Sequence, residues 1–449
     1  MKRQSDIFFR KPSTNPYRLF ILLILIMGGV WLIRQIEQGN ITRPFTPTPT
    51  PTRVAQSYAL EGDAQFEAGK LDAAITAYQE ATRVDPTDAE VWSKLARIQI
   101  YSSAQLTTDD QQRDRLQEGL ASINKAAELA PDDSAVHATR AFVLNWNANS
   151  IIFGEEQAAD YLLEAEQEAV RALQLDNQNT LALAFYAEIL VDEQKWGQAE
   201  QYILHAVEKD NTLMDVHRIY AYVLESLGQY NQAIQEYDKA IAISPNLTFL
   251  HLRAGANYRR LAFGSNNDAT RTQLYESSLE YFAKAARLNE QLGIEDPIPY
   301  LSIAKTYSQE GEYFVAARNV QKALEIDPAN PDIYGQLGIV YFKSRNYEGS
   351  IPAFKCAIRG CTAEESCDGR GGCGPNDEPS EVIGLDLSGN TVVYYYTYGS
   401  VLSALSRPQE NYCEEAMTVM GEVRAVYSND RDIMGIVQAG EAICQSLGE

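Results

Sequence analysis

The chain has 449 residues, of which 45% are hydrophobic, and a formal net charge of -23. This length allows a large core or a long repeat array, and so acidic a composition argues against nucleic acid as a partner. The charge is uneven, because residues 1–53 carry a net charge of +6 and the remainder carries -29. The two parts are therefore expected to face different surroundings.

An uncharged apolar run near the N-terminus reads LFILLILIMGGVWLI over residues 19–33. Extended to residue 36, it is about 20 residues long, enough to cross a bilayer when the flanking Arg18 and Arg34 reach toward the headgroups. A cleaved signal peptide is the alternative, but no small-residue cleavage pattern follows the run. We interpret residues 19–36 as an uncleaved transmembrane signal anchor.

Basic residues are denser before this anchor than after it, so residues 1–18 form a basic tail. By the positive-inside rule the tail is cytoplasmic and everything after residue 36 is extracytoplasmic. Residues 37–54 include the alternating prolines of RPFTPTPTPTR, which favour an extended, semi-rigid linker. The predicted location is the cell membrane, with a single span and the N-terminus inside.

From residue 55 onward, small residues recur at intervals of 34 residues or somewhat more. The recurring alanines are Ala81, Ala126, Ala172, Ala206, Ala240, Ala285, Ala323 and Ala357. A second small position recurs in the preceding apolar stripe, at Gly62, Ala96, Ala141, Ala187, Ala221, Gly255, Ala304 and Gly338. Helices that cross closely leave no room for longer side chains, so each unit is predicted to be a helix hairpin.

Large residues such as Tyr78 and Phe354 fill the gaps between these small positions, and prolines such as Pro86 and Pro245 close many units. This pattern resembles the tetratricopeptide repeat family over residues 55–362, which would make eight units. The family proline is missing at Asn177, Asn211, Glu290 and Thr362. The resemblance implies an all-α fold, a right-handed α-solenoid of helix hairpins.

Three units carry 11 or 12 extra residues, which are predicted to lengthen their second helices after a surface loop. Beyond the eighth unit, residues 363–390 form an insertion rich in cysteine, glycine and acidic residues. Residues 391–449 are expected to form a ninth, divergent hairpin and a capping helix that covers the last open face of the solenoid.

All six cysteines follow the anchor. An exported location permits disulfides, and an even count is consistent with full pairing. We predict that Cys413 pairs with Cys444, because the second helix of the ninth hairpin and the capping helix should be neighbours. The other four would pair among themselves in one of three schemes: Cys356, Cys361, Cys367 and Cys373. Zinc is disfavoured, because the sequence has no Cys-x-x-Cys pair and no histidine near the cluster.

No set of residues points to catalysis. The glycines of GRGGCG, residues 369–374, satisfy GxGxxG, but no strand precedes them and no helix pattern follows, so the phosphate-binding context is absent. His137, His217 and His251 occupy a first-helix core position that holds Trp92 in another unit, so we interpret them as packing residues. No serine, cysteine or lysine nucleophile has a recognisable partner. We expect a protein that is not an enzyme and needs no metal, cofactor or small-molecule substrate.

A second stripe on each first helix belongs to the inner surface of the solenoid, which in the tetratricopeptide repeat family often receives an extended peptide or a helix. In the fifth to seventh units the stripe mixes charged, aromatic and aliphatic residues: Asp215, Arg218, Tyr222, Glu225, Phe249, Leu252, Arg259, Leu301 and Lys305. These are the candidate partner-binding residues, and simple solvation of a concave wall is the alternative. The family's carboxylate clamp is absent, so chaperone C-terminal tails are not the expected ligand.

Together these patterns predict a membrane-anchored scaffold that binds a protein or peptide partner on the extracytoplasmic side. Two other hypotheses remain open. One is an architectural envelope protein that associates with itself, and the other is an accessory subunit that recruits an envelope or glycan enzyme.

Overall fold

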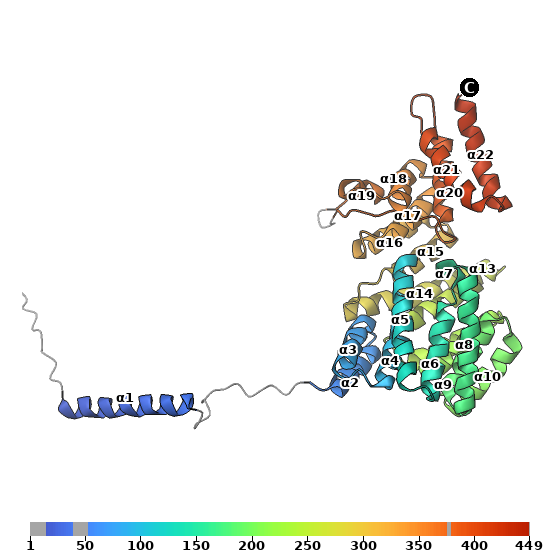
Figure 1. Cartoon of the computed structure of the whole chain (residues 1–449). Helices are drawn as coiled ribbons and strands as arrows, with labels where there is room; N and C mark the ends of the chain where they lie inside the picture. Colours follow the sequence, from blue (N-terminus) through green and yellow to red (C-terminus); the bar gives the residue numbers. More distant parts are fainter. Residues whose placement is uncertain (1–14, 39–52, 375–378, 449) are drawn as a thin grey trace, which may run out of the picture. The chain divides into compact units, whose positions relative to one another are not determined.

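The computed structural model describes residues 15–38, 53–374 and 379–448 (Figure 1). It divides the chain into two units, residues 1–53 and 54–449, which we treat separately.

The first unit contains a single described helix, α1 (Pro16–Glu37). Its segment Pro16–Gln35 has a mean hydropathy of 2.0 over 18 residues and is long and apolar enough to cross a membrane. The predicted anchor lies within this helix. Residues 1–14 of the predicted basic tail and residues 39–52 of the predicted linker lie outside the described residues.

The second unit is a succession of helix hairpins, nine in the part that the structure describes. The first helices of the hairpins are α2 (Ala55–Glu67), α4 (Ala89–Ser103), α6 (Ser134–Asn147), α9 (Thr180–Asp192), α11 (Met214–Ser226), α13 (Thr248–Gly264), α15 (Ile298–Glu310), α17 (Pro331–Lys343) and α20 (Val392–Leu405). The second helices are α3 (Leu71–Val84), α5 (Asp109–Leu129), α8 (Glu155–Leu175), α10 (Trp196–Lys209), α12 (Tyr230–Ile243), α14 (Asp268–Leu292), α16 (Tyr313–Ile326), α18 (Tyr347–Ile358) and α21 (Cys413–Tyr427). The remaining helices are α7 (Ser150–Phe153), α19 (Ala363–Gly369) and α22 (Arg431–Gly448).

Small residues set the close approach of the two helices in each hairpin. A Cβ added to Gly62 would lie 2.7 Å from the ring of Tyr78, and one added to Gly338 would lie 2.6 Å from the ring of Phe354. The eight recurring alanines of the second helices are all 0 or 1% exposed. An all-helical fold of this kind is therefore dictated by the small and large positions that alternate along the sequence.

The three long units have long second helices, as predicted. The helices α5 and α8 have 21 residues each and α14 has 25, whereas α10 and α12 have 14. The short helix α7 precedes α8. The extra residues therefore lengthen the second helices of these hairpins.

The histidines of the first helices lie between packed helices and tie each hairpin to the preceding turn. In His217, Nε2 lies 2.9 Å from the carbonyl oxygen of Asn211 and Nδ1 lies 2.7 Å from Glu236. The side chains at the equivalent positions reach the carbonyl six residues earlier in the same way, in Trp92, His137, His251 and Tyr334. Their role in packing is confirmed, and the hydrogen bond explains why a ring with a polar atom recurs at this position.

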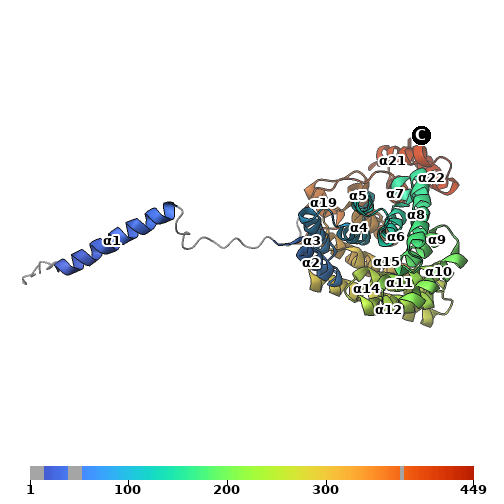
Figure 2. The ribbon, with the colours of Figure 1, turned by 60° about the horizontal axis from the view of Figure 1, so that its bottom comes forward.

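The solenoid coils tightly enough for distant hairpins to touch (Figure 2). The Asn246 side chain, between α12 and α13, donates a hydrogen bond of 3.0 Å to the carbonyl oxygen of Glu67, at the end of α2. Further along, Asp109 at the start of α5 accepts hydrogen bonds from Ser388 and Asn390, which precede α20. The first and second hairpins therefore contact segments from which at least four hairpins separate them.

The C-terminal part is cross-linked by three disulfides that involve all six cysteines: Cys356–Cys361, Cys367–Cys373 and Cys413–Cys444. The third joins the start of α21 to α22, which packs against both α20 and α21. The first two lie in and beside the inserted segment, where the backbone of Cys361 also pairs with that of Val382. The insertion is thus held both covalently and by backbone hydrogen bonds.

Candidate functional site

The inner surface of the solenoid is formed by the first helices, and it has a closed part and an open part. Of the predicted partner-binding residues, four lie on α11 and three on α13. The other two, Leu301 and Lys305, lie on α15. The residues on α11 belong to the closed part, whereas Arg259 and Lys305 belong to the open part.

Arg218 is at the centre of the closed part and is 6% exposed. Its guanidinium donates two hydrogen bonds, of 2.8 and 2.9 Å, to the two carboxylate oxygens of Glu188 on α9. The same group lies over the rings of Tyr101 and Phe142, 5.5 and 5.6 Å from their centroids. A charge so deeply buried is tolerated because it has a bidentate partner and aromatic faces around it.

Residues far apart in sequence complete this closed part. Asp215 is 1% exposed and accepts hydrogen bonds from Arg97 and Tyr101 of α4. The ring of Phe249, on α13, stacks on that of Tyr101 at a centroid distance of 5.2 Å. Side chains of α4, α11 and α13 therefore contact one another on the inner side of the coil, so this part of the inner surface is closed.

Two further hydrogen-bonded groups extend the closed part. Asp192 accepts hydrogen bonds from Tyr222 (2.6 Å) and Asn145 (2.7 Å), and burial raises the pKa of its carboxyl to about 6. Glu225 accepts a hydrogen bond from Asn257 and is 6% exposed. The structure thus places Asp215, Arg218 and Glu225 inside the protein and not on a free groove. Each of the three is hydrogen-bonded to a side chain of another first helix.

The open part begins at the end of α13 and continues over α15 and α17. Arg259 lies along α15, where it donates hydrogen bonds to the carbonyl oxygen of Ser302 (3.1 Å) and to Oγ1 of Thr306 (3.4 Å). Lys305, on the same helix, and Lys343, at the end of α17, are exposed. Burial and the charge of Arg260 lower the pKa of Arg259 to about 10.

A hollow of about 390 Å³ lies between α15, α17 and the start of α20. Its charged lining residues are Lys305 and Lys343, its neutral polar ones include Ser308, Gln309 and Gln336, and no carboxylate lines it. Lys343 and Arg260 were not among the predicted site residues, because each follows the inner stripe by one position. The signal that could have revealed them is the pair Arg259-Arg260 late in the sixth first helix and the lysine that ends the eighth.

A second hollow, of about 580 Å³, lies between α20 and α22, beside the turn from α17 to α18. Its lining is mostly apolar and includes Phe342, Val401, Ile436 and Ile443, with Asp432 as its one charged residue. Phe342, Ile436 and Ile443 are 36 to 42% exposed. Contiguous exposed apolar side chains are typical of contact sites for other molecules.

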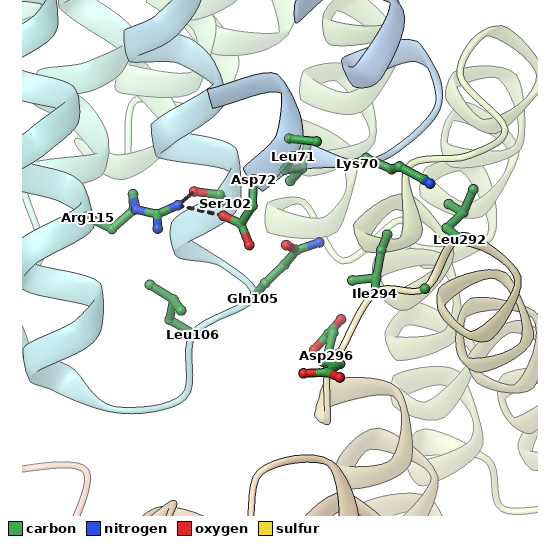
Figure 3. A pocket seen from close by; sticks show the side chains of 13 residues that line it. Lys70, Leu71, Asp72, Ser102, Gln105, Leu106, Arg115, Leu292, Ile294 and Asp296 are labelled. Carbon is green, nitrogen blue, oxygen red and sulfur yellow. Dashed lines mark hydrogen bonds and ion pairs between the residues drawn. The ribbon is translucent and has the colours of Figure 1, made fainter. Parts of the chain in front are cut away.

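A third hollow, of about 480 Å³, lies where the first hairpins meet the turn from α14 to α15 (Figure 3). Arg115 contacts Ser102 and Asp72 on one side of it, and Asp296 lies across from them (Figure 3). Asp296 is 4% exposed, and burial raises the pKa of its carboxyl to about 6. Arg115, Asp72, Ser102 and Asp296 are all hydrogen-bonded or ion-paired within the chain, so we interpret the hollow as a seam between coils of the solenoid.

Among the residues that the structure describes, no group of three or more His, Cys, Asp or Glu side chains is arranged to hold a metal ion. Models of known families match three segments of the chain. The family described as TPR repeat matches residues 62–99 and 296–344, and the family described as Tetratricopeptide repeat matches residues 219–247. The chain contains tetratricopeptide repeats.

Two solved structures are similar in fold over most of the chain. Human IFIT1, solved as a dimer with m7Gppp-AAAA, is 16% identical with a TM-score of 0.52, and the match covers 92% of each chain. A monomeric IFIT1 mutant with m7Gppp-AAAA is 14% identical with a TM-score of 0.52, covering 94% of this chain and 85% of that one. The Thermus thermophilus TPR protein TTC0263 is 17% identical over 45% of this chain and 98% of its own, with a TM-score of 0.38. At these identities the likeness to IFIT1 concerns the fold of the tetratricopeptide repeats.

Proposed function

We propose that this protein is a membrane-anchored scaffold whose tetratricopeptide repeats bind a protein partner on the extracytoplasmic side, without catalysis of its own. The observation that carries the proposal is the open part of the inner surface, where α15, α17, α20 and α22 leave two neighbouring hollows. Repeat solenoids use such extended concave surfaces for binding.

The predicted location rests on two further features. The segment Pro16–Gln35 is apolar enough to cross a membrane, and basic residues are concentrated before it. Three disulfides in the second unit fit an oxidising compartment, because cytosolic proteins are normally kept reduced. Both features favour an arrangement in which the repeats lie outside the cytoplasm.

The test is cross-linking in intact cells with a membrane-impermeant reagent, followed by affinity purification and mass spectrometry. A different protein cross-linked to the repeats would support the scaffold, and a co-purifying catalytic chain would support its accessory-subunit form. Cross-links between copies alone would favour the architectural alternative. If the repeats react only after the cells are broken open, the extracytoplasmic location is wrong.

A further inference from the structure

Four cations lie near one another on three successive first helices, and two of them, Lys305 and Lys343, line the first hollow of the open part. Arg259 and Arg260 lie in the C-terminal half of α13, Lys305 lies on α15 and Lys343 ends α17. In the described part of the chain none of the four forms an ion pair with a carboxylate, whereas Arg97 and Arg218 of the closed part both do. The cluster stands in a unit whose net charge is -29.

The geometry holds these charges close together. Arg259 bonds to Ser302 and Thr306, three residues before and one residue after Lys305, so its guanidinium lies beside that lysine on α15. Burial, with the charges of Arg259, Lys343 and Arg260, lowers the pKa of the Lys305 ammonium. Like charges held close together repel one another, and an anion bound between them relieves that repulsion.

The apolar hollow continues this surface along α20. Val393 and Tyr394 line the first hollow, while Ser400, Val401 and Ala404 line the second. Val393 and Ser400 are seven residues apart, which is about two helical turns on the same face, or about 10 Å along the helix. One face of α20 therefore runs from the cationic hollow to the apolar one.

We infer that the surface formed by α15, α17, α20 and α22 binds an acidic peptide segment of a partner protein, with carboxylates at Lys305 and Lys343 and an apolar side chain between α20 and α22. This inference rests on the proposed scaffold function and names the chemistry of its partner. Charge complementarity at one end and exposed Ile436 and Ile443 at the other select a peptide that has both kinds of group. Nucleic acid fits less well, because its phosphates would meet the repulsion of a strongly acidic unit and offer nothing to the apolar end.

The test is selection from a random 12-residue peptide library displayed on phage, with the full chain in lipid nanodiscs as bait. We expect the selected peptides to combine clustered Asp or Glu with Leu, Ile or Phe. The double variant Lys305→Gln/Lys343→Gln is expected to bind them at least tenfold more weakly. Lys125→Gln/Lys209→Gln removes the same charge from the exposed surfaces of α5 and α10 and is expected to stay within twofold of wild type.

Peptides without an acidic bias, or equal losses in both double variants, would overturn the inference. So would tighter binding of a 12-nucleotide poly(A) RNA that is lost in Lys305→Gln/Lys343→Gln, because the surface would then belong to nucleic acid. Circular dichroism of each variant establishes that it folds. If the cellular partner is still cross-linked to Lys305→Gln/Lys343→Gln, the scaffold stands and only the acidic-peptide inference fails.

Discussion

Arg218 and Glu188 show how single residues determine whether the inner surface is open or closed. Both side chains are buried, and their two hydrogen bonds hold α9 to α11 beneath the ring of Tyr101. Neither charge has access to water that could replace its partner. The pair is therefore part of the core of the first coil.

Replacing Arg218 by Met is expected to lower the free energy of unfolding by about 3 to 5 kcal/mol, because it leaves the Glu188 carboxylate buried and unpaired. The measurement is urea denaturation of the full chain in detergent. The double variant Arg218→Met/Glu188→Leu removes both charges and is expected to recover most of the loss. If the double variant is no more stable than Arg218→Met alone, the ion pair is not the cause.

Tyr334 represents the polar ring that ties each first helix to the preceding turn. Its hydroxyl donates to the carbonyl oxygen of Pro328 (3.1 Å) and accepts from Nε of Arg370 (2.9 Å). We expect Tyr334→Phe to reduce the free energy of unfolding by about 1 to 3 kcal/mol, since it leaves buried polar groups without this partner. Tyr307→Phe, at a half-buried tyrosine of α15, is the control and is expected to change it by less than about 0.5 kcal/mol. Equal shifts in the two urea midpoints would contradict the role given to the hydroxyl.

Asp296 makes the stability of the fold depend on pH. Its carboxyl has a pKa of about 6 in the folded chain, above the ordinary value of 3.8, because it is buried at the seam between α14 and α15. The folded state therefore holds the proton more tightly than the unfolded state, so the contribution of this group to stability is full below about pH 4 and is lost between about pH 4 and 6.

Asp296→Asn is expected to abolish this loss. The free energy of unfolding of the variant, relative to that of wild type, should rise by on the order of 2 to 3 kcal/mol as the pH rises from 4 to 7. Thermal denaturation at a series of pH values measures the difference, and Asp160→Asn, at an exposed position on α8, controls for the loss of one negative charge. A difference that does not change with pH would show that Asp296 does not titrate in this range.

At the scale of the elements, the turns between helices show two uses of glycine. Gly69, between α2 and α3, and Gly228, between α11 and α12, both have φ in the left-handed region, at 79° and 73°. A Cβ on Gly69 would lie 2.0 Å from the carbonyl oxygen of Asn246, whereas one on Gly228 would meet nothing within 4 Å. The first glycine therefore serves both the turn and the contact between coils.

Gly228→Ala should lower the free energy of unfolding by about 1 kcal/mol, the strain of a left-handed alanine. Gly69→Ala should lower it by about 1 to 3 kcal/mol more, because the backbone around Asn246 must also move. Urea denaturation of the two variants compares them directly. If both lose the same amount, the contact between the coils contributes nothing measurable.

The helix hairpins could be predicted from sequence because their determinants are local. Small positions such as Gly62 and Ala81 recur at intervals of 34 residues or somewhat more, and the helices that they allow to cross are the ones found. The closed part of the inner surface could not be predicted in this way. Asp215 occupies a position in the stripe that the sequence assigns to an open groove. Its hydrogen-bond partner Tyr101, however, lies 114 residues away. The two residues meet only because of the rotations that accumulate from one hairpin to the next. Of the cationic cluster, Arg259 and Lys305 occupy the inner stripe of the first helices and could be predicted from it. Lys343 lies one position beyond that stripe and could not.

At the scale of the whole molecule, the disulfides and the anchor together predict where the chain is oxidised. The protein is expressed in cells and denatured in the presence of a maleimide-polyethylene glycol, which labels free thiols. We expect none of the six cysteines to be labelled until a reductant is added. The reason is that a disulfide persists outside the cytoplasm and is reduced within it. Several labelled cysteines without reductant would contradict the extracytoplasmic location. A truncated chain that lacks residues 1–38 and stays in the cytosol is the control, and it should react without reductant.

The contact of Asn246 with Glu67 and of Asp109 with Ser388 and Asn390 also bears on how such a chain can evolve. An open array tolerates the gain or loss of one unit, since each repeat touches only its neighbours. Here a duplicated or deleted unit between α3 and α12 would shift every later hairpin out of register with the first. The copy number of the repeats is thus constrained by geometry, and related chains should differ in the lengths of α5, α8 and α14 more readily than in their number of hairpins.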